Sequence, residues 1–171
     1  MFSQLLDGIT FEVKSPDGKI SLELEDGLNV TMDIAVGVYR RYPEHTLQQQ
    51  LSGLIGKFWS AHKQAHLMML SELAGYQVRD RHIDTDRRTR EFLDERAAIR
   101  VEGASQSGHI RVTGAGLSAW SVQIKPRTVR ELTEGEFLNG FWTAFAAATR
   151  DYARKVAVLK KEVLTVPAHY R

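Results

Sequence analysis

Lysine and arginine side chains are concentrated in two stretches of this sequence, where their spacing suits contacts with phosphate groups. On the last long helix that the sequence predicts, Arg150, Arg154 and Lys161 share one face, as phosphate contacts require. The candidate nucleic-acid-binding residues of that helix are Arg150, Arg154, Lys155, Lys160 and Lys161. A second group, in the connector between the two halves of the chain, comprises Arg79, Arg81, Arg87, Arg88 and Arg90.

The connector has two interpretations, because carboxylates from Asp80 to Glu95 interleave with its arginines. A helix of mixed charge is usually a solvated face with internal ion pairs. The connector arginines therefore fit either a phosphate-binding surface or an ordinary exposed helix.

Other residues that could do chemistry have structural explanations. His62 and His66 are four residues apart, which suits a metal, but no third ligand is near and position 63 is not the glutamate of a zinc protease motif. Trp120 is in phase with apolar strand residues, which favours burial or a dimer interface over base stacking; the same holds for Trp59 and Trp142. We find no nucleophile elbow, metal set or catalytic carboxylate pair, and we expect neither an enzyme nor a cofactor.

The composition is that of a folded domain: 43% of the 171 residues are hydrophobic and 26% are charged. Residues 1–97 carry 12 Lys/Arg against 15 Asp/Glu, and residues 98–171 carry 11 against 6, so a polyanion would meet the second half. There is no cysteine, no apolar run long enough to span a membrane, and too short an N-terminal stretch for a signal peptide. We therefore expect a cytoplasmic protein with no membrane partner.

The chain repeats itself at an offset of 90 residues, which becomes 87 after a shorter loop. Apolar and glycine positions coincide in the two copies. The matching pairs include Gly18 and Gly108, Ile20 and Ile110, Leu22 and Val112, Ile34 and Ile124, Leu51 and Leu138, and Phe58 and Phe145.

Each copy begins with three segments of alternating apolar and polar residues, the pattern of a three-stranded antiparallel meander. Turns are expected at 15–18, 25–27, 104–108 and 114–116. A long helix follows each meander, beginning near Pro43 in copy one and at a capping box of Thr133 and Glu136 in copy two. A shorter helix, capped within 84–86, is expected to run to about Ala97.

Copy two resembles the YbaB/EbfC family of nucleoid-associated proteins. The resemblance covers about 70 residues. It rests on Val101-Glu102-Gly103, the turn ending at Gly108, His109 to Thr113, Gly116, Val122 to Pro126, and a helix with Phe145, Ala146 to Ala148, Arg154 and Lys155. It implies a helix, a meander and a long helix, homodimers, and DNA binding with little sequence preference. The sequence departs from the family in lacking a Gly/Met/Pro-rich tail, and copy one lacks the leading helix.

Copy one is also similar to YbaB-like domains of proteins associated with type VII (ESX) secretion. The similar residues are Phe11, Val13, Ser15, Pro16, Gly18, Lys19 and Ile20, with the Asp26-Gly27 turn. This resemblance implies an accessory or chaperone-like adaptor with a protein client. Tyr76 to Asp80 matches the loose Tyr-x-x-x-Asp/Glu export pattern of that pathway, but a pattern with two fixed positions arises easily by chance, and a plain helix-end segment is the favoured interpretation.

These observations predict an α+β fold of two tandem β-β-β-α units, residues 1–79 and 80–171, arranged as an intrachain pseudo-dimer. The first hypothesis is a nucleoid-associated protein that binds duplex DNA through the basic helix of copy two. The alternatives are a protein-binding adaptor that uses aromatic surface or sheet edges, and self-assembly alone. A homodimer through the outer strands or helices stays open.

Overall fold

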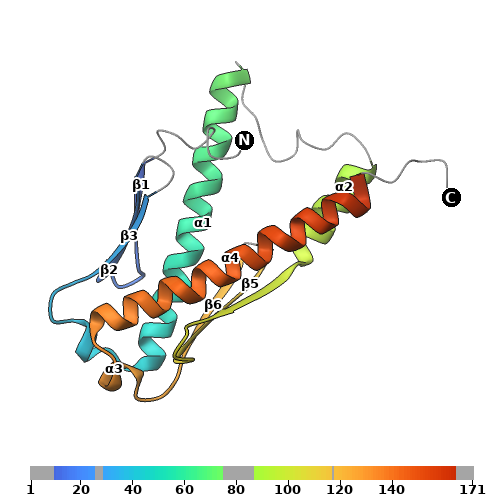
Figure 1. The fold of residues 1–171 in the computed structure, drawn as a ribbon. Coiled ribbons are helices and arrows are strands. Elements are labelled where there is room, and N and C mark those ends of the chain that lie inside the picture. Colours follow the sequence, from blue (N-terminus) through green and yellow to red (C-terminus); the bar gives the residue numbers. More distant parts are fainter. Residues whose placement is uncertain (1–9, 26–28, 75–86, 117, 165–171) are drawn as a thin grey trace.

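The computed structural model describes residues 10–25, 29–74, 87–116 and 118–164. In this part the chain forms two three-stranded antiparallel sheets and two long helices, an α+β fold (Figure 1). The first sheet contains β1 (Phe11–Lys14), β2 (Ile20–Glu25) and β3 (Asn29–Ile34), followed by η2 (Tyr39–Arg41) and α1 (Glu44–Ala74). The helix α2 (Arg87–Ala98) precedes the second sheet of β4 (Arg100–Ala104), β5 (Ile110–Ala115) and β6 (Ala119–Ile124), which is followed by α3 (Thr128–Glu131) and α4 (Glu134–Leu164).

The first hairpin of each sheet closes through the same hydrogen bonds, 90 residues apart. The Ile20 amide donates to Ser15 Oγ at 3.0 Å, and the Ile110 amide donates to Ser105 Oγ at 3.0 Å. Both turns also need a glycine, because Gly18 has a φ of 73° and its counterpart a φ of 70°. The two expected β-β-β-α units are therefore present, with matching local structure.

One predicted turn is wrong. Gly114 and Ala115 were expected in the turn at 114–116, but both belong to β5. Gly114 lies opposite Trp120 in the register, and a Cβ atom on Gly114 would be 2.9 Å from the Trp120 ring. The glycine is there because the indole lies across it, and the chain turns only at Gly116, whose φ is 58°. The predicted turn at Asp26-Gly27 lies outside the described residues.

The predicted helix starts are confirmed. The first long helix begins at Glu44, directly after Pro43, and the second begins at Glu134 behind the predicted capping box. Thr133 Oγ1 accepts a hydrogen bond from the Glu136 amide at 3.3 Å, and Glu136 Oε2 accepts one from the Thr133 amide at 2.7 Å. The bonds from the backbone and side chain of Thr133 lower the pKa of Glu136. The short helix α2 is present too, although its predicted cap is not among the described residues.

The two halves of the chain share buried contacts. Alternate residues of each strand turn inward, and the buried residues of both halves form one hydrophobic cluster. The helix α1 packs on β1 and β2 of its own sheet and also along β6 of the other sheet. Polar contacts cross between the halves as well: Tyr39 Oη donates to the Leu132 carbonyl at 3.2 Å, and the Val129 amide donates to Glu44 Oε1 at 3.3 Å.

The helix α4 lies unusually close to β4. A Cβ atom on Gly103 would be 2.0 Å from the Ala144 carbonyl oxygen and 2.5 Å from the Ala148 nitrogen. Only glycine allows this approach, and the small alanines of α4 complete it. The equivalent strand residue of the first sheet is Val13, and α1 packs on β1 less extensively than α4 packs on β4. None of the helices among the described residues is long and apolar enough to cross a membrane.

Candidate nucleic-acid interface

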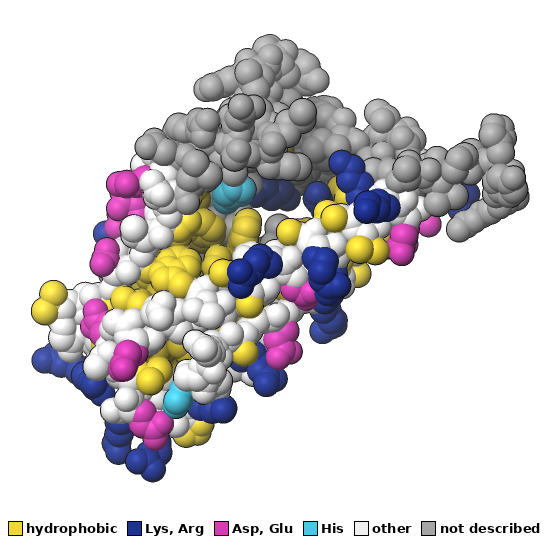
Figure 2. Space-filling model, in the orientation of Figure 1, with side chains coloured by type: hydrophobic (Ala, Val, Ile, Leu, Met, Phe, Trp, Pro, Cys, Tyr) yellow, Lys and Arg dark blue, Asp and Glu magenta, His cyan; other side chains and the backbone are white. Residues whose placement is uncertain are grey.

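Three of the predicted cations share one exposed face of α4. Arg150, Arg154 and Lys161 are all exposed. At about 100° per residue they fall within roughly 40° of one line along the helix, and they span about 16 Å. Figure 2 shows Lys and Arg side chains spaced along the visible face of this helix. The predicted shared face is therefore geometrically present.

The other two cations of the helix lie off this face. At the same helical spacing Lys155 and Lys160 project to opposite sides of the line. The Lys155 ammonium is also engaged, because it donates to the Arg100 carbonyl at 2.8 Å and contacts Asp151 Oδ2 at 2.7 Å. It therefore ties α4 to β4 and is less available to a phosphate than its neighbours.

Asp151 reduces the charge of the interface. Its carboxylate receives hydrogen bonds from Lys155 and from Arg154 Nη2, the latter at 2.7 Å. These two bonds, that of Lys155 first, hold the pKa of Asp151 below its ordinary value, so the carboxylate is ionised at neutral pH. Sequence reasoning missed this residue, although its spacing of three and four residues from the two cations is the usual one for helical ion pairs.

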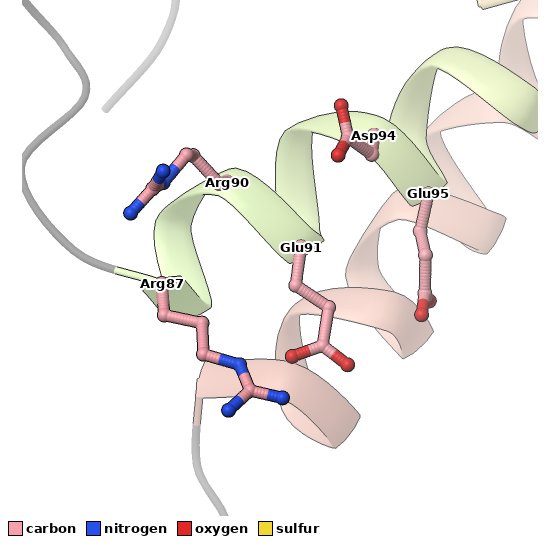
Figure 3. A pocket seen from close by; sticks show the side chains of 5 residues that line it. All are labelled: Arg87, Arg90, Glu91, Asp94 and Glu95. Atoms are coloured by element: carbon pink, nitrogen blue, oxygen red, sulfur yellow. The ribbon is translucent and has the colours of Figure 1, made fainter.

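The connector residues are placed only in part. Arg87 is exposed on the first turn of α2, and for Arg88, in the same turn, the structure describes the backbone alone. Arg79, Arg81 and the segment Tyr76 to Asp80 lie outside the described residues. A shallow depression of about 540 Å³ on α2 is lined by Arg87, Arg90, Glu91, Asp94 and Glu95 (Figure 3). This mixture of charges fits the solvent-exposed interpretation of the connector.

The arrangement of α2 against α4 nevertheless brings the two basic groups toward one end of the protein. Figure 3 shows the first turn of α2, which carries Arg87, beside the last turns of α4, where Lys160 and Lys161 lie, and the two helices pack together. Farther along α2, Arg96 lies close enough to Tyr152 of α4 to oppose the rise in the pKa of Tyr152 that burial causes. The basic end therefore combines residues from two separate segments of the sequence.

The outer faces of the two sheets differ in charge. The exposed residues of the first sheet include four carboxylates and one lysine, namely Glu12, Glu23, Glu25, Asp33 and Lys14. In the strands of the second sheet, the exposed charges are Arg100, Arg111 and Glu102, and Arg111 pairs with Glu102 at 3.3 Å. The outer face of the first sheet is therefore acidic, whereas that of the second is slightly basic.

The tryptophans lie at the core rather than on an open binding surface. Trp120 is buried, as predicted, while Trp59 and Trp142 are half-buried and pack against the core. His62 stacks on Phe58, with 6.4 Å between the ring centroids. For His66, the other member of the pair, the structure describes only the backbone.

Comparison with known proteins gives no family assignment, because neither a protein-family model nor a curated protein matches this chain. The YbaB/EbfC resemblance therefore rests on the sequence motifs quoted for it.

Proposed function

We propose that this chain is a nucleoid-associated protein whose two units form an intrachain pseudo-dimer and which binds duplex DNA with little sequence preference. The observation that carries the proposal is the exposed line of Arg150, Arg154 and Lys161 on α4. Arg87, on the first turn of α2, lies at the end of the molecule where α4 ends, near the helix turns that carry Lys160 and Lys161. Phosphate contacts of this kind neutralise charge and read no bases, which accounts for the weak sequence preference.

The pseudo-dimer is supported by the contacts between the halves. α1 packs along β6, and Tyr39 reaches the Leu132 carbonyl. In the proposed pseudo-dimer, such contacts take the role that contacts between two chains would have in a homodimer of single units. One chain would then carry two copies of the unit but only one basic helix, so that DNA would bind on one side.

The test is fluorescence anisotropy of a labelled 30-base-pair duplex at two salt concentrations. With about four phosphate contacts, a fourfold rise in salt should weaken binding on the order of 100-fold. Absence of binding at low salt would overturn the proposal.

The basic face of α4 is tested by reversing the charge of two exposed residues whose side chains make no described structural contact. Among the described residues Arg150 and Lys161 form no ion pair, so Arg150→Glu with Lys161→Glu should fold normally and lose most of the affinity. The matched control is Lys14→Glu with Lys19→Glu, which makes the same change in net charge on the first half. Equal losses in both variants would mean that overall charge, not this face, controls binding.

A second candidate function is a protein-binding adaptor. The observation that favours it is a hollow, visible in Figure 2, where hydrophobic side chains gather between the first sheet and α4. The acidic outer face of the first sheet points away from a role in DNA binding for that half. An adaptor of this kind is expected to form a complex with a partner protein, and the stability of that complex should depend little on salt concentration.

A further inference from the structure

One edge of the first sheet presents unpaired backbone groups. The Ala35 amide donates to the Lys19 carbonyl at 2.9 Å, which makes these two residues a hydrogen-bonded pair. Because such pairs alternate along an antiparallel ladder, the amides and carbonyls of Val30, Met32 and Ile34 point away from β2. In the described part of the chain β3 pairs with β2 alone, so these groups form a free edge.

The equivalent edge of the second sheet is covered by α1. The Val122 amide donates to Ser52 Oγ at 3.0 Å, and the Ile124 amide donates to Gln48 Oε1 at 2.6 Å. Two side chains of the helix thus replace the missing neighbouring strand. This is a common way of protecting a sheet edge from unwanted pairing.

Among the described residues, nothing protects the β3 edge of the first sheet in this way. The residues of α4 that correspond to Gln48 and Ser52 are Gly135, which has no side chain, and Asn139. No described side chain bonds the Met32 or Ile34 amide, and the packing of α1 along β6 has no equally extensive counterpart between α4 and β3. In the described part of the chain, no helix therefore lies along β3 as α1 lies along β6.

The space beside this edge is apolar. Figure 2 shows the hydrophobic hollow between the first sheet and α4, with α1 behind it in the view of Figure 1. Both helices carry half-buried aromatic side chains, among them Trp59 and Phe145, whose ring centroids are 6.4 Å apart. An added strand would place alternate side chains toward this apolar side, next to the buried Met32 and Ile34.

The opposite face of an added strand would meet negative charge. Its other side chains would lie beside Thr31 and Asp33, on the face that also carries Glu23 and Glu25. Lysine or arginine at these positions would gain ion pairs, and aspartate or glutamate would be repelled. The charge of the face thus selects the chemistry of the partner.

We propose that β3 and the adjoining hollow bind an extended segment of a partner protein, in which apolar residues alternate with lysine or arginine, by strand addition. Main-chain hydrogen bonds to Val30, Met32 and Ile34 supply affinity, and the alternation supplies specificity. A second copy of this chain is disfavoured, because pairing two β3 strands would join two acidic faces. Strand addition uses the backbone of β3, whereas DNA binding uses the Lys and Arg side chains of α4, so either proposal can fail without the other.

The experiment uses labelled eight-residue peptides and the full chain in fluorescence anisotropy. A peptide of alternating valine and lysine should bind, and two controls should bind at least about tenfold more weakly: the same residues in two blocks, and alternating valine and glutamate. N-methylation of alternate amides on one edge of the peptide should abolish binding, while N-methylation on the other edge should not. Equal binding of the three peptides, or indifference to N-methylation at both edges, would overturn the proposal.

A variant of the protein locates the site. Asp33→Asn should weaken the valine–lysine peptide about threefold to tenfold and leave DNA binding unchanged. Light scattering, run in parallel, should give one mass over a wide range of concentration. A dimer lost in Val30→Pro would instead assign the edge to a second copy. If the peptide bound only after removal of residues 1–9, the β3 edge would be assigned to that segment of the same chain. Either result would overturn the proposal.

Discussion

The indole rings of Trp59 and Trp120 lie nearly parallel, with 6.0 Å between their centroids and 10° between their planes, although they come from opposite halves of the chain. Phe145 of α4 contacts both rings, at 6.4 Å and 5.6 Å between centroids. α1, β6 and α4 therefore meet at one aromatic cluster. This cluster, like the hydrogen bonds of Gln48 and Ser52, joins the first helix to the second sheet.

The aromatic cluster makes Trp120 the more costly of the two indoles to replace. Trp120→Ala should lower the free energy of unfolding by about 3–5 kcal/mol, because a large buried ring leaves a cavity. Trp59→Phe should cost less than about 1 kcal/mol, since the ring contacts persist and the buried Trp59 Nε1 has no described hydrogen-bond partner to lose. Urea unfolding followed by circular dichroism measures both. The reverse order of costs would contradict the proposed packing.

The close approach of α4 to β4 predicts opposite effects for two glycine substitutions. Gly103→Ala should be strongly destabilising, by more than about 3 kcal/mol, because the new methyl group meets the backbone of α4. Gly56→Ala, on α1, has nothing within 4 Å of the new Cβ and should stabilise the protein by about 0.5–1 kcal/mol. Thermal unfolding of the two variants beside the parent chain would decide, and a tolerated Gly103→Ala would refute the contact.

Asp17 gives the first hairpin a pH-dependent contribution to stability. Burial alone would raise its pKa, but hydrogen bonds from Tyr42 Oη at 2.6 Å, Ser15 and the Lys19 amide outweigh burial and lower the pKa below 3.8. A group with a depressed pKa stabilises the fold above its unfolded pKa, and this contribution is lost as the pH falls through the folded value.

Asp17→Asn should therefore be less stable than the parent chain at pH 7, and the difference should shrink below about pH 3.8. Urea unfolding at pH 7 and pH 3 measures the change. Tyr42→Phe, which keeps the ring and removes the hydroxyl bond, should reproduce the pH 7 loss in part. A difference that grows on acidification would show that the carboxylate is not held as described.

Removing the negative charge of Asp151 tests the DNA-binding proposal with a variant that is expected to bind DNA more tightly. Asp151→Asn frees Arg154 and removes a charge that repels phosphate, so affinity for the duplex should rise about threefold to tenfold at low salt. Asp33→Asn, on the first sheet, is the control for net charge and should leave the affinity unchanged. Weaker binding by Asp151→Asn would mean that Asp151 positions the cations rather than opposing them.

Much of the fold could be predicted from the sequence, because strand alternation, hairpin turns and the Thr133–Glu136 capping box are local signals. Two short helical segments, η2 and α3, were not predicted, because a single turn is too short to show a helical repeat of apolar residues. Each nevertheless buries a side chain, Tyr39 in η2 and Val129 in α3. Gly114 was misassigned because a glycine under an indole and a glycine in a turn are identical in a sequence.

The cations of the candidate site could be predicted from the sequence, but the nearby carboxylate of Asp151, which reduces their net charge, was not. The shared face of Arg150, Arg154 and Lys161 follows from helical spacing alone. The packing of α1 along β6 does not, because an apolar stripe does not specify that the helix contacts the second sheet as well as its own. The contact with β6 depends on groups distant in sequence, such as the Ser52 hydroxyl and the Val122 amide, which are 70 positions apart.

That separation affects how the chain is made. At about 5–20 residues per second, a ribosome adds the 70 residues between Ser52 and Val122 in roughly 4–14 seconds. Throughout that interval β6, whose amides bond Gln48 and Ser52 and whose Trp120 stacks on Trp59 in the finished chain, has not yet been translated. Until β6 is made, the face of α1 that packs along it has no partner strand, so the half-made chain exposes apolar surface that the finished chain buries.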